Sequence, residues 1–370
     1  MNESDLMNRL EKTADKVMET ILKLKAKEKV LIITNPDIER ISISQALYRA
    51  SEKGKGKPCL IVQSEKKQSD FAEDAVIEAI KSEPDIIISI SKNKLGKDRQ
   101  AIASPWKIGE KTYDSTFHYL LGGVKKCRAF WSPGITRDMF IRTVPLDYNK
   151  LKKDCFFLKN ILDRAAGIRI TSDSGTDIYI GTGGRKALCD DGDFSAPGTG
   201  GNLPAGETFI SPQPGSSSGI IVFDGSISTD EGDIIIKNPV KVKVEKGFVT
   251  SVDGGREAGI LLKTIEKARK NAIQFEKEGK LPAGKGELYS RNAFNIGELG
   301  IGLNPEAEIR GNMLEDEKAF KTCHIAIGSN YDDDAPALIH LDGLVKNPTI
   351  KAVFPDSSGT VVMENGLIVY

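Results

Sequence analysis

Several features that commonly reveal a function are missing from this 370-residue chain. Lys and Arg together number 52, as do Asp and Glu, so no excess of one sign indicates nucleic acid or an anionic membrane as a partner. No apolar run approaches the roughly 18 residues of a membrane span, and the N-terminal stretch lacks the apolar centre of a secretory signal peptide. These absences predict a cytoplasmic protein that binds neither nucleic acid nor a membrane.

Cysteine patterns and nucleotide-binding motifs are also lacking. The five cysteines are an odd number with wide spacing and form no CxxC pair, which is typical of reduced thiols in a cytoplasm. The turn after the first predicted strand reads TNPDIER and has no GxGxxG fingerprint, and no GxxxxGK[ST] loop occurs. The N-terminal half is therefore predicted to be a scaffold without a phosphate cradle.

The N-terminal half alternates short apolar runs with helical patterns. Continuous apolar strands separated by helices are typical of βαβ units, whose parallel sheet is covered on both faces. The expected strands are 29–35, 59–63, 85–91 and 127–133, and the expected helices are 3–27, 37–53, 70–82 and a bridging helix at 149–165. This pattern predicts a doubly wound parallel α/β domain over residues 1–165.

Beyond residue 165 the pattern changes. The stretch IRITSDSGTDIYIG at 168–181 alternates apolar and polar residues between Gly and Ser turns, which is typical of antiparallel strands. Further strands follow, with one long helix expected at 255–278. The chain as a whole is predicted to be α/β, with a C-terminal, mostly β (α+β) metal-binding and catalytic domain at 166–370.

Histidine is the scarcest residue that could carry chemistry. Of three histidines, His324 and His340 lie within a stretch rich in carboxylates, and His118 lies far from it in the sequence. In a strand, His340 and Asp342 would project from one face, because residues two apart share a face. Imidazoles and carboxylates that converge from several strands suit a divalent metal. The competing interpretation is that each is an ordinary core or surface histidine, and the residues alone leave both open.

Glutamates beside glycine are further candidates. Glu207 follows Gly206 and Glu298 follows Gly297, and both lie in apolar strand sequence, where an unpaired charge would be costly. The alternative is that they are exposed. Glu317 lies in the charged run EDEK, and a DDD run follows at 332–334. Runs of this kind are usually solvated.

Four segments taken together carry a resemblance to a known family. They are NLPAGETFISP, IGELGIGLNP, LEDEKAFKTCHIAIGSNY and HLD, in this order between residues 202 and 342. Their order and residue types resemble the signature of the aminopeptidase T and aminopeptidase S group of metallopeptidases. The resemblance implies metal ligands at the following positions: Glu207, Glu298, Glu317, His324, His340 and Asp342. It also implies a tyrosine near the reaction centre, at Tyr331.

The same resemblance implies a function. A metallo-aminopeptidase of this group is a hydrolase that removes N-terminal residues from peptides with a metal-activated water. It would hold two divalent ions, which would be zinc, cobalt or manganese. Glu298 would bridge them and accept a proton, and Tyr331 would donate a hydrogen bond to the oxyanion. The group also implies a homodimer. Hydrolysis is the favoured prediction.

Two other functions fit the same residues. Ring-opening dioxygenases that act on 2,5-dihydroxypyridine are similar in the GETFISP and LEDEK segments, and they bind a single Fe(II) through two histidines and one aspartate. His324, His340 and Asp342 would supply that set. The remaining alternative is a non-catalytic protein that keeps the fold and its metal.

Overall fold

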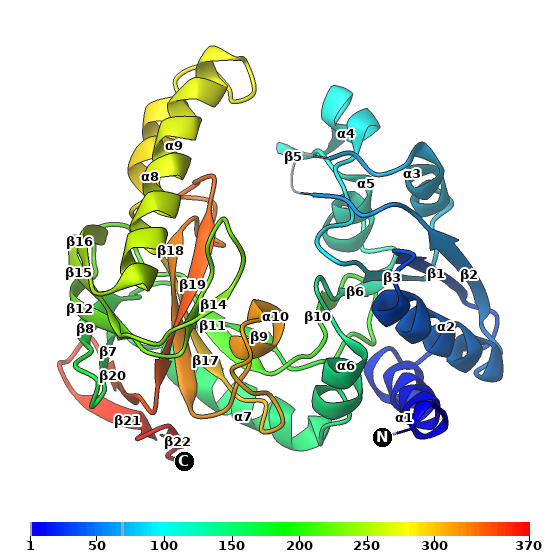
Figure 1. Cartoon of the computed structure of the whole chain (residues 1–370), viewed down its shortest axis with the longest axis horizontal. Helices are drawn as coiled ribbons and strands as arrows, with labels where there is room; N and C mark the ends of the chain where they lie inside the picture. Colours follow the sequence, from blue (N-terminus) through cyan, green and yellow to red (C-terminus); the bar gives the residue numbers. More distant parts are fainter. Residues whose placement is uncertain (1, 68–69) are drawn as a thin grey trace. The chain divides into compact units, whose positions relative to one another are not determined.

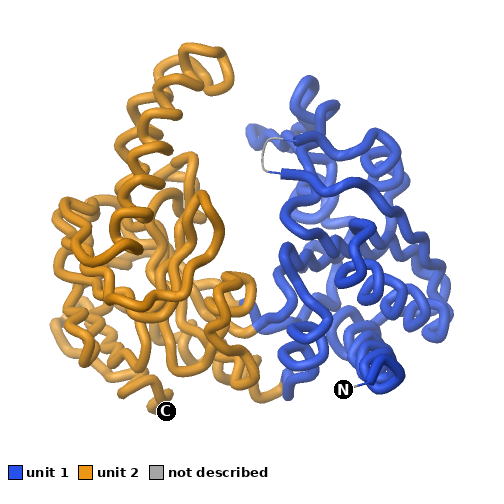
Figure 2. The backbone as a smooth tube through the Cα atoms, viewed as in Figure 1, with its two compact units in different colours: residues 1–148, 190–205 blue, residues 149–189, 206–370 orange. Residues whose placement is uncertain are grey.

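The computed structural model describes residues 2–67 and 70–370 of the chain. Contacts between Cα atoms divide it into two compact units, which Figure 2 distinguishes by colour. The first unit comprises residues 1–148 and 190–205, and the second comprises residues 149–189 and 206–370. The predicted division at residue 165 stays a prediction.

The first unit is built on a parallel sheet with buried central strands. Its strands, in sheet order, are β10 (Gly200–Asn202), β6 (Arg128–Trp131), β3 (Ile86–Ile90), β1 (Lys29–Thr34) and β2 (Lys57–Val62). All pair in parallel, and every residue of β3 is buried, as expected for a sheet covered on both faces. The helices are α1 (Glu3–Lys16), α2 (Ile38–Lys53), α3 (Asp74–Lys81), α4 (Arg99–Ala103), α5 (Thr116–His118) and α6 (Arg137–Thr143), with π-turns at Val17–Ile21 and Tyr119–Gly123 and a hairpin of β4 (Trp106–Ile108) and β5 (Lys111–Tyr113).

The second unit contains two larger sheets, whose described pairings are antiparallel. One has the strand order β14 (Ile234–Ile235), β13 (Ser226–Ile227), β19 (His340–Lys346), β18 (Thr322–Gly328), β17 (Ile296–Gly302), β11 (Glu207–Ile210) and β9 (Leu188–Asp190). The other has the order β16 (Phe248–Asp253), β15 (Val240–Glu245), β12 (Ser218–Phe223), β8 (Asp177–Gly181), β7 (Gly167–Thr171), β20 (Thr349–Val353), β21 (Gly359–Glu364) and β22 (Leu367–Ile368).

Four helices accompany these sheets. They are α7 (Tyr148–Leu162), α8 (Arg256–Lys277), α9 (Gly286–Asn292) and α10 (Met313–Asp316). The long α8 packs against α9, and both are drawn in yellow-green and yellow in Figure 1. Strands β17 and β18 are buried at every residue, so the middle of the seven-stranded sheet lies inside the unit. Any charged side chain on these strands must therefore find a partner.

The predicted α/β fold class, with a parallel sheet followed by antiparallel sheets, is confirmed. The largest differences in element bounds are in two N-terminal helices. The helix expected at 3–27 leaves the α conformation after Lys16, where a π-turn takes over, and the helix expected at 70–82 begins only at Asp74. Within the described residues, none of the helices combines the length and the apolar character needed to cross a bilayer.

Candidate metal centre

Four neighbouring strands present five of the six candidate ligands from one face of the seven-stranded sheet, and Glu317 follows the short helix α10. Glu298 of β17 is in register with Ala326 of β18, which is in register with Asp342 of β19. Because residues two apart share a face, His324 lies on the same face as Ala326, and His340 on the same face as Asp342. On β11, Glu207 is paired with Gly302 of β17, which shares the face of Glu298.

The positions between these ligands on that face are glycine or alanine. On β17 they are Gly300 and Gly302, and on β18 they are Ala326 and Gly328. At Gly300 a Cβ would lie 2.1 Å from the His324 ring, so only glycine leaves room for the imidazole. Gly300 thus accommodates a ligand side chain, and Gly297 lies against the backbone carbonyl of Ser329.

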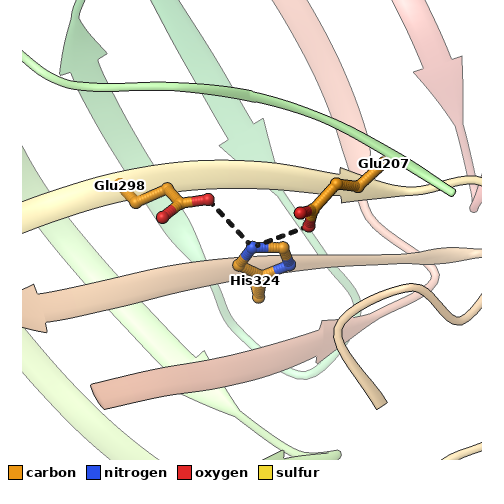
Figure 3. Close-up of side chains that lie close together, drawn as sticks. All are labelled: Glu207, Glu298 and His324. Carbon is orange, nitrogen blue, oxygen red and sulfur yellow. Dashed lines mark hydrogen bonds and ion pairs between the residues drawn. The ribbon is translucent and has the colours of Figure 1, made fainter. Parts of the chain in front are cut away.

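His324 lies between two glutamates, as Figure 3 shows. Its Nε2 is 3.3 Å from Oε1 of Glu298 and 3.5 Å from Oε2 of Glu207. The three side chains are almost completely buried, with 0% of His324, 3% of Glu298 and 6% of Glu207 exposed. Two buried carboxylates that face one imidazole nitrogen are costly without a positive charge, so a cation bound between them would stabilise the folded protein.

His340 is oriented by a backbone hydrogen bond. Its Nδ1 donates to the carbonyl oxygen of Ser329 at 2.9 Å, which leaves Nε2 to face the cluster. That Nε2 is 3.1 Å from Oε2 of Glu298 and 3.4 Å from Oδ1 of Asp342. A carbonyl that fixes the tautomer of a histidine is the usual support behind a metal-bound imidazole.

The carboxylates raise the proton affinity of both imidazoles. Burial alone would lower the pKa of His324, but the hydrogen bond to Glu298 and the charges of Glu207 and Glu298 raise it to about 9. The pKa of His340 is likewise raised well above its ordinary value, against burial, by Asp342 and Glu298. In turn, the histidines outweigh burial and lower the pKa of Asp342 to about 2. The site therefore favours positive charge.

Six side chains form what we call the carboxylate–histidine cluster, namely Glu207, Glu298, Glu317, His324, His340 and Asp342. Three groups within it have ligand atoms within 4.8 Å of one another. They are Glu207 with Glu298 and His324, Glu298 with His340 and Asp342, and Glu317 with His324 and Asp342. Among the described residues, no hydrogen bond reaches the buried Oδ1 of Asp342. Four carboxylates and two imidazoles in a buried space fit a divalent cation.

The run EDEK at 315–318, for which solvation is the usual outcome, is mostly buried. Glu315, Asp316 and Lys318 are each 1% exposed or less. Asp316 accepts hydrogen bonds from the backbone of Arg310 and from the hydroxyl of Ser226, which explains how its charge is tolerated. Burial raises the pKa of Glu317 to about 8.

Lys318 reaches the cluster from this run. Its Nζ donates to Oε1 of Glu207 at 2.5 Å and to Oε1 of Glu317 at 2.6 Å. Lys318 was not predicted to be part of the site, because charged runs such as EDEK usually lie on the protein surface. The signal that could have identified it is local: the run precedes β18, in which every residue except Thr322 and the ligand His324 is apolar or glycine.

Tyr331 lies at the margin of the cluster. Its side chain is 57% exposed, and its ring centroid is 5.4 Å from that of His340 and 5.2 Å from that of Phe209. The following loop is held by Arg185, which forms ion pairs with Asp332 at 3.3 Å and Asp334 at 2.6 Å. The three aspartates are exposed, as expected for such a run, and two of them are also ion-paired to Arg185.

Comparison with known proteins decides between the families that share this arrangement. Residues 136–329, just over half of the chain, match the family model described as 2,5-dihydroxypyridine 5,6-dioxygenase. The chain belongs to this family. It is therefore an enzyme.

Individual relatives agree with this assignment. A 2,5-dihydroxypyridine 5,6-dioxygenase of Pseudomonas putida (strain KT2440) is 27% identical over 185 residues, which cover 48% of this chain and 45% of the relative. The sequence match thus spans less than half of the relative's length. The structure of 2,5-dihydroxypyridine dioxygenase from Pseudomonas putida KT2440 has the same fold, with a TM-score of 0.70, 17% identity and coverage of 98% of this chain and 97% of that one.

The prediction that the chain is an aminopeptidase is wrong. The family match and the relative indicate a dioxygenase instead of a metallopeptidase, protease or other hydrolase, and they give no support to zinc or cobalt. The reason for the error is structural. AmpT from Thermus thermophilus has the same fold, with a TM-score of 0.67, 14% identity and coverage of 98% of this chain and 99% of that one. Both neighbours have the fold of this chain, so sequence segments that indicate this fold do not distinguish hydrolysis from ring opening.

Proposed function

We propose that this protein is a mononuclear Fe(II) dioxygenase that opens the ring of 2,5-dihydroxypyridine or a closely related dihydroxylated nitrogen heterocycle. One ion is held by His324, His340 and Asp342, which together make the two-histidine, one-carboxylate donor set of non-haem iron oxygenases. The observation that carries the proposal is that the three donors lie on neighbouring strands of one sheet, in a chain of the dihydroxypyridine dioxygenase family. The ligand atoms of Asp342 lie within 4.8 Å of those of His340 in one group and of those of His324 in another. Fe(II) would supply the redox chemistry that lets O2 react with a closed-shell ring.

Residues of the chain orient the donor set. The carbonyl of Ser329 accepts the hydrogen bond from His340 Nδ1 and so directs Nε2 into the cluster. Gly300 leaves room for the His324 ring, and the neighbouring histidines hold the pKa of the Asp342 carboxyl low, at about 2, against burial. These features keep the donors in place before any ligand arrives.

Glu298 is suited to accept a proton from a ring hydroxyl. Its two oxygens lie 3.3 Å from His324 Nε2 and 3.1 Å from His340 Nε2, and its side chain is 3% exposed. The two histidines hold its pKa below the ordinary value in spite of burial, so the carboxylate is available as a base. Deprotonating a ring hydroxyl would make the ring more electron-rich at the carbons to be oxidised.

The rings at the margin provide a surface for a planar substrate. Tyr331 packs against both Phe209 and His340, and more than half of its surface is exposed. A flat heteroaromatic ring stacks on such a side chain with a gain of about 1 kcal/mol. Tyr331 therefore orients the substrate ring under this proposal and has no acid–base role.

The experiment is an oxygen-consumption assay. The purified chain is loaded with Fe(II) under anaerobic conditions and mixed with 2,5-dihydroxypyridine and O2. Stoichiometric oxygen uptake with loss of the ring's ultraviolet absorbance is expected, and omission of iron should abolish both. An iron-loaded, folded protein that leaves a panel of dihydroxypyridines unchanged would contradict the proposal.

A further inference from the structure

We infer that the ammonium group of Lys318 occupies the place of a second divalent cation, so that this cluster holds a single metal ion. The inference rests on the proposed function only for the position of the first ion, near His340 and Asp342. It concerns the residue that limits the number of bound ions. A site with one ion and a site with two ions catalyse different reactions, even when the fold is the same.

The contacts of Lys318 are those of a bound cation. Its Nζ lies 2.5 Å from an oxygen of Glu207 and 2.6 Å from an oxygen of Glu317, and the lysine is 0% exposed. Each of these glutamates belongs to a group that could hold an ion together with His324. The lysine therefore binds Glu207 and Glu317, and neither of these carboxylates belongs to the group of ligand atoms that contains His340.

The backbone is built to deliver this side chain. At Gly302, which is paired with Glu207, a Cβ would lie 2.1 Å from the carbonyl oxygen of Ala319, so the 318–319 segment rests directly on the sheet. The carbonyl of Lys318 accepts a hydrogen bond from the backbone of Asn304 at 2.9 Å. Asp316 anchors the preceding turn through Ser226 at 2.7 Å. The position of Lys318 is thus fixed by contacts on several sides.

Charge repulsion gives the same result. With four ionised carboxylates, Lys318 and one divalent ion leave the cluster with about one negative charge, and a second ion would reverse the sign. A second divalent ion beside the ammonium would place like charges within a few ångströms of each other, which is strongly unfavourable in a buried site. Lysine and a second ion are therefore alternatives for Glu207 and Glu317.

The test counts the ions. Wild type and the variant Lys318→Ala are dialysed against excess Mn(II), and bound metal is measured together with the electron paramagnetic resonance spectrum. Wild type should bind one equivalent with the signal of an isolated ion. Lys318→Ala should bind two, with a spin-coupled signal, because the vacated carboxylates can ligate the second ion. Lys346→Ala, which removes an exposed lysine at the end of β19, is the matched control and should bind one.

The outcomes separate this inference from the proposed function, because metal counting needs no ring cleavage. A folded Lys318→Ala protein that still binds one equivalent would overturn the inference, and so would a spin-coupled pair in wild type. If the alanine variant does not fold, Lys318→Gln is measured in its place. The number of Mn(II) ions bound by wild type tests the inference without any variant. A single ion with no dioxygenase activity would refute the function and leave the inference intact.

Discussion

The imidazole of His324 lies over Gly300 on the neighbouring strand, where an added Cβ would come within 2.1 Å of the ring atoms Cε1 and Nε2. Because both residues are in buried strands, neither can move far. We expect Gly300→Ala to displace the ring and to weaken Fe(II) binding by about 10-fold or more, the scale seen when ligand orientation is disturbed. Isothermal titration with Fe(II) measures this.

The matched control is Gly259→Ala in α8, where an added Cβ meets nothing within 4 Å. This variant should keep full iron affinity and gain about 0.5–1 kcal/mol of stability, because alanine is the better helix former. Equal iron affinity in the two variants would show that the ring of His324 is not a ligand.

His340 should be required for metal binding. We expect His340→Ala to lose bound iron and oxygen consumption together, because it removes one of two imidazole donors from a set of three. His118→Ala, a change at the exposed histidine of α5, should retain both. Elemental analysis of the two purified variants measures the difference, and iron content unchanged in His340→Ala would sink the assignment.

Glu298 should act on the reaction more than on the metal. Glu298→Gln keeps the shape and removes a proton acceptor, so the rate of ring opening should fall by about 10²-fold, the scale of general base catalysis. Bound iron should remain near one equivalent, since His324, His340 and Asp342 are intact. Glu287→Gln, at an exposed position of α9, is the control. Complete iron loss in Glu298→Gln would instead make this residue a ligand.

A stability prediction concerns the first unit. Asp98, 3% exposed, caps α4 and accepts hydrogen bonds from Ala101 N at 2.9 Å and from the hydroxyl of Thr116 at 2.6 Å. These bonds outweigh desolvation and lower the pKa of its carboxyl. Asp98→Ala should therefore reduce the unfolding free energy near neutral pH by about 2–3 kcal/mol, the scale of hydrogen bonds to a buried charge.

The pH dependence of this effect has a definite sign. Because the folded-state pKa of Asp98 lies below the unfolded value of about 3.9, its stabilisation is present above that value and disappears as pH falls through the folded-state pKa. Denaturant titrations of wild type and Asp98→Ala should therefore converge only in acid. The exposed Asp114→Ala should match wild type throughout, and a constant gap down to the lowest pH would contradict the account.

Much of the fold follows from apolar patterns that depend on local sequence. The continuous runs of β1 and β3 require burial on both faces, and such strands occur mainly in parallel sheets. The change to alternation in β15, where residues of VKVKVE are buried and exposed in turn, indicates an antiparallel sheet. A short segment such as β10 could not be predicted, because its glycines carry no apolar signal and its pairing with β6 is a long-range contact.

The candidate ligands could be predicted because histidine is rare and the HxD spacing puts two donors on one face of a strand. The role of Lys318 could not be predicted, because the sequence of a charged run does not show whether the run is exposed to solvent or buried against a sheet. The four sequence segments also could not distinguish hydrolysis from ring opening. Glu207, Glu298 and both histidines fit a two-ion and a one-ion site alike, and the homodimer and the cytoplasmic location stay predictions.

Isotope labelling shows directly whether the chain inserts both atoms of O2 into a dihydroxylated heterocycle. The iron-loaded protein is incubated with 2,5-dihydroxypyridine and isotopically labelled O2 in unlabelled water. The masses of the ring-opened products are measured by mass spectrometry. We expect the products together to contain both heavy atoms, with one O2 consumed per ring. Products whose new oxygen comes only from water, or ring loss that proceeds without O2, would contradict the claim.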